Sequence, residues 1–198
     1  MMNCDYTNRT VYSFHDEIEQ QKDAISYAGI SKGHSLENAL QCHPVSNQWV
    51  QFFVPKILDI PVRKPDIEGI VSVNSCIEII SKRVVNTPMV TGYTRADGVY
   101  VPGEEIPNGE CTHLTGKKLI IEGVLHQKVI YTAMVADQSL HSASFMIPFS
   151  TFIIVEKDKP LTQDFTVYPY LEDVFVCRLS ERSIFSNNTL FIKAIPVC

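Results

Sequence analysis

The chain has 198 residues and a mass of 22.3 kDa, with 17 basic and 22 acidic side chains and a formal net charge of −5. A chain of this length forms one domain, or one domain with an arm, since single domains usually have roughly 100–200 residues. With 45% hydrophobic residues it can bury a sizeable core, which excludes disorder along the whole chain. The acidic balance argues against nucleic acid as a partner, because neutralising phosphates requires clustered Lys and Arg.

No stretch of the chain resembles a membrane span or a secretory signal. A spanning helix needs about 20 predominantly apolar residues, and no run of that kind occurs. The first 20 residues contain no apolar core segment and are acidic by Asp16. We therefore expect a soluble protein that is made in a cytoplasm and has no membrane partner.

The first 47 residues differ from the rest of the chain. Residues 15–28 have only sparse apolar positions, a weakly helical pattern that ends at Gly29. A second short helical segment opens at residues 35–38 and must stop before Pro44. Neither segment has a convincing apolar face. We therefore expect residues 1–47 to form an arm that packs on another surface, in this subunit or in a neighbour.

From Gln48 onwards, the residues alternate as they do in β-strands. Residues 118–135 form the longest such run: odd-numbered positions from 119 to 131 share one face, and Glu122, His126 and Lys128 share the other. Residues 70–80 alternate in the same way. Further strand-like runs cover residues 49–54, 142–155, 172–180 and 188–197. Pro148 lies midway along one of them and indicates an edge strand or a bulge.

Turn residues separate these runs, and no helical periodicity follows Gln48. Long alternating strands without intervening helices favour an antiparallel sandwich over a sheet built from βαβ units. We therefore predict an all-β fold. Residues 48–198 are predicted to form an antiparallel β-sandwich, and residues 1–47 a partly helical or irregular N-terminal arm.

The sequence lacks the motifs of common enzyme classes. It contains no G-x-S-x-G, no G-x-x-x-x-G-K-[ST], no G-x-G-x-x-G and no H-E-x-x-H. Cys42-His43 and Cys111-Thr112-His113 together offer four metal ligands, but their spacing matches no known zinc finger, so polar loop positions are the simpler interpretation. We expect no catalytic residue, no cofactor and no bound metal, and predict that the protein is not an enzyme.

Two further clusters have a structural and a functional interpretation. Asp66 and Glu68 in the segment KPDIE would lie on one face of a strand, as paired acid–base work requires. They are instead predicted to belong to a structural turn, where Lys64 or Arg63 pairs with an acid.

Trp49, Phe52 and Phe53 could form a platform for a sugar. A core or interface position is favoured, because aromatic residues on both faces of an apolar strand usually become buried.

The six cysteines allow two interpretations. They are Cys4, Cys42, Cys76, Cys111, Cys177 and Cys198, and none forms a C-x-x-C pair. All six remain free thiols in a reducing cytosol, or those near the chain ends cross-link subunits once the protein reaches an oxidising environment.

Strand parity separates two of these cysteines. Cys177 shares parity with Phe175, so it is predicted to be buried in the core without a cross-link. Cys76 is in phase with Glu78 and is predicted to lie on a more polar face.

Several segments, taken in this order, resemble the SPOCS domain of spore-forming Clostridia: IPVRKPDIEGIVSVNSCIEII (60–80), TGKKLIIEGVLHQKVIY (115–131), HSASFMIPFSTFIIV (141–155), PYLEDVFV (169–176) and RSIFSNNTLFI (182–192). The resemblance covers roughly residues 48–195. The family is best known from SipL, a spore coat morphogenetic protein that combines SPOCS with a C-terminal LysM module. This sequence shows no LysM, so the resemblance implies a stand-alone SPOCS protein, and it supplies no catalytic residues.

The resemblance implies a structural protein of the spore surface: coat, exosporium or appendage. Such proteins are made in the mother-cell cytoplasm and become external when that cell lyses, so their thiols then meet an oxidising environment. We expect self-assembly through sandwich packing and the arm, with the protein itself as the main partner and other spore coat proteins as further partners. The alternative is a binding module that does not polymerise and docks to another spore protein or a surface glycan.

Intermolecular disulfides are expected first at Cys4 and Cys198, with Cys42 and Cys111 as further candidates. The first two lie near the chain ends, where the backbone can adjust to the Cα separation of about 4.4–6.8 Å that a disulfide requires.

Overall fold

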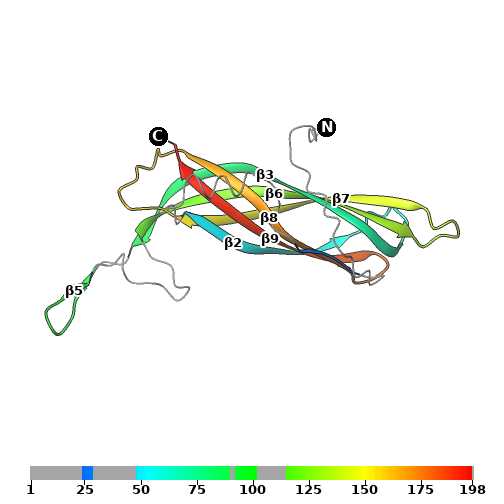
Figure 1. Ribbon diagram of the computed structural model, residues 1–198, viewed down its shortest axis with the longest axis horizontal. Helices are drawn as coiled ribbons and strands as arrows, with labels where there is room; N and C mark the ends of the chain where they lie inside the picture. Colours follow the sequence, from blue (N-terminus) through cyan, green and yellow to red (C-terminus); the bar gives the residue numbers. More distant parts are fainter. Residues whose placement is uncertain (1–23, 29–47, 90–91, 102–114, 198) are drawn as a thin grey trace.

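The computed structural model describes residues 24–28, 48–89, 92–101 and 115–197. Every regular element in these residues is a β-strand, and the long strands run along the long axis of the molecule in two layers (Figure 1). All strand pairs in the described residues are antiparallel. The prediction of an all-β antiparallel sandwich is therefore confirmed.

Four strands form the first sheet, in the order β1-β8-β9-β2: β1 (Ala24–Ala28), β8 (Phe165–Arg178), β9 (Ser183–Pro196) and β2 (Trp49–Asp59). Three strands form the second, in the order β3-β6-β7: β3 (Ile67–Met89), β6 (Thr115–Ala133) and β7 (Leu140–Ile154). A small hairpin pairs β4 (Tyr93–Thr94) with β5 (Tyr100–Val101). Pro148 lies in β7, an outer strand of its sheet, as predicted for an edge strand.

Strand β1 corrects the expectation for the arm. The weakly helical pattern of residues 15–28 is wrong over Ala24–Ala28, which pair with β8. An isolated short helix has little stability in water, whereas Ile25 and Tyr27 are residue types that suit a pleated strand. The rest of the arm, including the second helical segment predicted at residues 35–38, lies outside the described residues.

The alternation predicted for residues 119–131 is confirmed by the central strand β6. Its odd-numbered side chains face the first sheet, and those of Leu119, Ile121, Leu125, Gln127, Val129 and Tyr131 are at most 1% exposed. The central strand of the other sheet matches it, because Ile184, Leu190, Ile192 and Ala194 of β9 are 0% exposed. The core therefore lies between the two central strands, where the inward side chains of each sheet pack against those of the other and are shielded from water.

A polar contact crosses this apolar core. Gln127 Nε2 on β6 donates to Asn188 Oδ1 on β9 at 3.1 Å, and Asn188 Nδ2 donates to Ser186 Oγ at 2.9 Å. Gln127 Nε2 also lies 3.2 Å from Ser75 Oγ on β3. Buried polar groups of this kind fix how two layers are placed, because a shifted register would leave them without hydrogen bonds.

Candidate interaction surface

Strand β2 carries apolar side chains on both of its faces. Val54 and Leu58 point into the core and are 7% and 5% exposed. On the opposite face, Trp49, Phe53 and Ile57 are 51%, 67% and 58% exposed. A strand with one solvated face usually alternates apolar and polar residues, so folding alone does not require the outward set. Such an exposed apolar row is a candidate interaction surface.

The outward apolar set continues across the two neighbouring strands. Trp49 stacks on Phe191 of β9, with ring centroids 5.5 Å apart and an interplanar angle of 25°. Phe191 in turn lies 6.1 Å from the ring of Tyr170 on β8. Tyr168 points outward beside them, opposite Lys193. We define the aromatic face as Trp49, Phe53, Ile57, Tyr168, Tyr170 and Phe191. Within this set Tyr170 is only 6% exposed and Phe191 is half-buried, whereas the other four side chains are exposed.

The prediction for the three aromatic residues of β2 is confirmed for one of them. Phe52 packs against the core and lies 5.6 Å from the ring of Phe149 on β7. Trp49 and Phe53 have the other parity and lie on the solvent side. An interface role for these two stays a prediction. The sequence could not indicate which of them face the core, because both the odd-numbered and the even-numbered positions of β2 are mostly apolar.

Acidic groups of this sheet lie on β8, where Glu172 contacts Gln51 between Trp49 and Phe53 of the outward row, and at Asp59, the exposed last residue of β2. Gln51 Nε2 donates to Glu172 Oε2 at 2.5 Å, and Asp173 follows on the outward side opposite Thr189. Burial raises the pKa of the half-buried Asp173 carboxyl, although a hydrogen bond from the Val174 backbone N–H acts the other way. The outward positions 49–57 of β2 carry no charged side chain.

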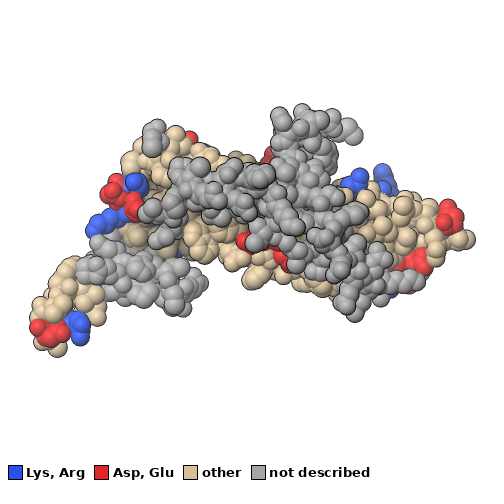
Figure 2. All heavy atoms as spheres, viewed as in Figure 1, with Lys and Arg blue, Asp and Glu red and all other residues tan. Residues whose placement is uncertain are grey.

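Figure 2 shows one face of the molecule. Described Lys, Arg, Asp and Glu side chains are visible at both of its ends, and a few acidic ones are visible between them.

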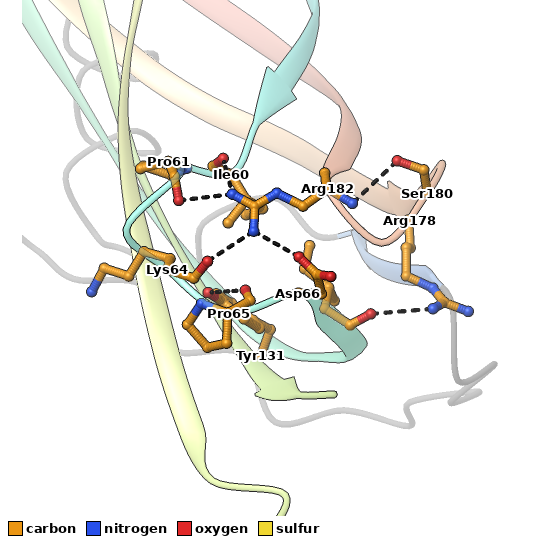
Figure 3. A network of polar contacts seen from close by, with 10 residues as sticks. Ile60, Pro61, Lys64, Pro65, Asp66, Tyr131, Arg178, Ser180 and Arg182 are labelled. Carbon is orange, nitrogen blue, oxygen red and sulfur yellow. Dashed lines mark hydrogen bonds and ion pairs between the residues drawn. The ribbon is translucent and has the colours of Figure 1, made fainter. Parts of the chain in front are cut away.

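A second site lies at one end of the sandwich, where Arg182 binds the connection between β2 and β3 (Figure 3). Its Nη1 donates to Lys64 O at 2.8 Å and to Asp66 Oδ1 at 2.6 Å. Its Nη2 donates to Ile60 O at 3.0 Å and to Pro61 O at 2.9 Å. One guanidinium thus satisfies four acceptors of a connection that makes few ladder hydrogen bonds.

The pairing predicted for the KPDIE segment is wrong in its partner. Asp66 pairs with Arg182, from the turn between β8 and β9, and not with Lys64 or Arg63. Sequence proximity favoured the two near residues, whereas the sandwich brings together residues that lie 116 positions apart. The structural interpretation of the turn is nevertheless supported, because Asp66 is engaged in this network.

Tyr131 of β6 contacts the same connection between β2 and β3 (Figure 3). Its hydroxyl donates to Pro65 O at 3.0 Å, and its ring is 0% exposed. Burial raises the pKa of Tyr131, while the positive charge of Arg182 lowers it and the negative charge of Asp66 raises it. Two sequence blocks of the family resemblance, KPDIE and RSIF, therefore meet in space through Arg182, which the sequence alone did not single out.

Cys76 lies on the outer face of the second sheet, as its parity predicts. It is paired across the strands with His126, and His126 Nε2 lies 2.8 Å from Glu78 Oε2. Their neighbours Ser75 and Ile77 take the inward positions. The histidine is thus held by a carboxylate on the sheet surface.

The prediction that Cys177 faces the core is wrong. Val174 and Val176, of the opposite parity, are 7% and 0% exposed and fill the core, while Cys177 is half-buried on the outer face. Residues 174–177 are apolar at every position, so the sequence pattern did not indicate which of them face the core. Burial raises the pKa of the Cys177 thiol, and it forms no disulfide with another described residue.

The four cysteines expected in intermolecular disulfides, Cys4, Cys42, Cys111 and Cys198, all lie outside the described residues. So do His43 and His113 of the disfavoured metal site. Within the described ranges, no group of three or more His, Cys, Asp or Glu side chains is placed to hold one metal ion. No helix in that part of the chain has the length and apolar character to cross a bilayer.

Comparison with known families gives one match. The family model described as SipL, SPOCS domain, matches residues 66–178, which is more than half of the chain. No curated protein and no solved structure matches the sequence. The match begins just before β3 and ends with β8, so β2 and β9 lie beyond it although both belong to the same sandwich. The chain therefore belongs to the SipL SPOCS-domain family, which ties it to sporulation.

Proposed function

We propose that the protein is a non-catalytic structural component of the spore surface, in coat, exosporium or appendage, and that it assembles with copies of itself. The aromatic face is the observation that carries this proposal. Three of its side chains on β2 leave more than half of their surface in water. Burying a large apolar side chain contributes about 1.5–3 kcal/mol, so an exposed row of three is a costly surface for a lone subunit to keep.

A copy of the chain is the partner that fits this face best. The outward positions of β2 are uncharged from Trp49 to Ile57, whereas the chain as a whole carries a net charge of −5. Copies that meet along these positions therefore bring no charged residue of the row against another. A two-fold contact uses the same patch on both subunits, so an uncharged, mostly apolar row can pair with its own copy.

Variants of this row test the proposal. Replacing Trp49 and Phe53 together by serine is expected to lower the fraction of protein in sedimenting assemblies by at least about tenfold, since each tenfold change corresponds to 1.4 kcal/mol. The fold should persist, because both side chains lie outside the core. Analytical ultracentrifugation measures the first result and thermal unfolding the second.

Met146 provides the matched control. It is 70% exposed on β7, in the other sheet. Met146→Ser should leave assembly unchanged, because it removes a similar apolar surface from a different face. Equal assembly by the double variant and the wild type would show that the aromatic face is not the contact.

Disulfides between subunits lock the assembly in this proposal. The protein is made in the reducing mother-cell cytoplasm and is deposited on the spore surface, where lysis of that cell exposes its thiols to oxidant. Cys4 and Cys198 form the first cross-links, and Cys42 and Cys111 are further candidates. Covalent bonds then stabilise contacts that packing has already specified.

Replacing Cys4 and Cys198 by serine is expected to remove most covalent multimers after oxidation while the assemblies still form. The reason is that packing, not disulfide formation, brings the subunits into register. A non-reducing gel of oxidised assemblies measures the multimers, and a Cys76→Ser variant is the control that should retain them. A ladder identical to that of the wild type would assign the cross-links to other cysteines.

One observation favours a second candidate function. Trp49 and Tyr168 flank Lys193 in a single row of the sheet, so two exposed aromatic side chains lie two strands apart, about 10 Å from the strand spacing. Sugars stack on aromatic rings, and a module that does not polymerise could bind a surface glycan or another spore protein there. Retention of the soluble monomer by insoluble glycan, lost in Tyr168→Ser, would support this alternative over self-assembly.

A further inference from the structure

Prolines mark the outer strands of both sheets. The outer strands β2 and β7 carry Pro55 and Pro148 near their centres. By contrast, the central strand β6 contains no proline, and in the central strand β9 the only proline is its last residue, Pro196. Proline lacks the N–H that a further strand would need, so edges that carry it resist pairing with another chain.

The remaining outer strand, β3, and the part of β8 that does not pair with β1 are interrupted in other ways. β3 contains four register shifts along its pairing with β6, and Pro88 lies near its end. β8 contains Pro169, followed by a bulge between Leu171 and Asp173. Bulges twist and kink an edge, which also discourages strand addition.

One stretch of β8 escapes these interruptions. Residues 173–177 lie beyond both the proline and the bulge, and they are the stretch that pairs with β1. β8 thus accepts a strand along a stretch that contains neither a proline nor a bulge. The strand it accepts comes from the predicted arm.

We propose that residues 173–177 of β8 form an acceptor site for strand β1 of a second copy of this chain. The inference deepens the proposed function and rests on it. β1 and β2 are consecutive in the sequence yet lie at opposite edges of one sheet, so no short hairpin ties β1 to its own domain. Exchange of such an element between identical subunits keeps the same ladder hydrogen bonds and changes only the chain that supplies them.

The length of chain between the two strands permits this exchange. Residues 29–48 separate β1 from β2, and at about 3.3–3.6 Å per residue they reach at most about 66–72 Å when extended. β8 itself has 14 residues, which corresponds to about 46 Å at 3.3 Å per residue. An arm of this reach can pass its strand to a neighbouring sandwich. Packing along the aromatic face raises the effective concentration of the neighbour's acceptor site.

The register of β1 supplies a direct test. Ala24 lies opposite Cys177, and residues directly opposite in an antiparallel pair have Cα atoms about 4.5–5.5 Å apart, within the range of a disulfide. A donor copy carries Ala24→Cys with Cys177→Ser, and an acceptor copy retains Cys177. The other native cysteines are replaced by serine in both. A disulfide at this position can then form only between two copies.

Donor and acceptor are mixed, assembled and oxidised, and a non-reducing gel is read for the donor–acceptor band. The proposal predicts that band, and predicts its absence for a control donor with Ala28→Cys and Cys177→Ser, because Ala28 lies opposite Asp173. Assemblies that form without the band would overturn the exchange while leaving the proposed function intact. Failure of both copies to assemble at any concentration would overturn both.

A second measurement checks that β1 still pairs with β8 when it carries the Ala24→Cys substitution. A single copy carrying Ala24→Cys together with Cys177, with its other cysteines replaced by serine, is oxidised as a dilute monomer and as an assembly. A bond within the chain in the monomer shows that the register is intact. The proposal predicts that assembly shifts this bond to covalent multimers, and a bond that stays within each chain in the assembly would contradict it.

Discussion

Replacing Arg182 by methionine is expected to lower the free energy of unfolding by about 2–3 kcal/mol. The side chain satisfies three backbone carbonyls and one carboxylate of the connection between β2 and β3. Methionine keeps much of the aliphatic stem but donates no hydrogen bond. Because the Arg182 side chain is 38% and that of Asp66 41% exposed, water replaces part of what is lost. For this reason the expected effect is well below the sum of four contacts.

Arg63 offers the matched control for this variant. It lies in the same connection and is exposed, so Arg63→Met removes an equal charge without breaking the network. Denaturant unfolding of both variants measures the difference, and amide hydrogen exchange at Lys64 reports whether the connection itself has loosened. If the two variants unfold at the same denaturant concentration, the network contributes nothing to stability.

Replacing Gly123 by alanine is expected to destabilise the protein by about 1–3 kcal/mol, the usual cost of overpacking a filled core. Gly123 lies on the inward face of β6, directly opposite Phe149 of β7. A Cβ at this position would come within 2.5 Å of both Glu78 O and Phe149 Cζ. The glycine is therefore required for the ring of Phe149 to lie over the strand, and not for an unusual backbone conformation.

A double variant separates the two clashes. Phe149→Leu removes the ring and leaves the backbone contact with Glu78, so Gly123→Ala should cost less in that background than in the wild type. Thermal unfolding of the four proteins of this cycle gives the coupling energy. An alanine variant as stable as the wild type would mean that β6 and β7 can shift apart at this point.

The sequence was sufficient for the fold wherever one face of a strand differed from the other. In residues 119–131 the charged residues and the histidine all share one face, and every inward position expected there, Gly123 included, is buried in the structure. The outward position of Cys76 was predicted correctly in the same way. The position of Cys177 was not, because residues 174–177 are apolar throughout, so either the odd-numbered or the even-numbered side chains could have filled the core.

The candidate sites depend on contacts between distant parts of the chain, which a single sequence does not reveal. Arg182 and Asp66 are 116 positions apart in the sequence, and the local pattern of neither segment predicts their contact. Residues 24–28 have weak local preferences, and pairing with β8 decides their structure. The aromatic residues of β2 were visible in the sequence, but only the packing of Phe52 on Phe149 shows which of them remain for the surface.

The measurement that tests the central claim most directly is negative-stain electron microscopy of the purified wild-type protein, prepared first without and then with reductant. The account predicts ordered fibres or sheets in both preparations, because contacts along the aromatic face specify the assembly, with heat resistance reduced when reductant is present. A monodisperse monomer or dimer in both preparations, at concentrations up to those at which the protein remains soluble, would contradict it.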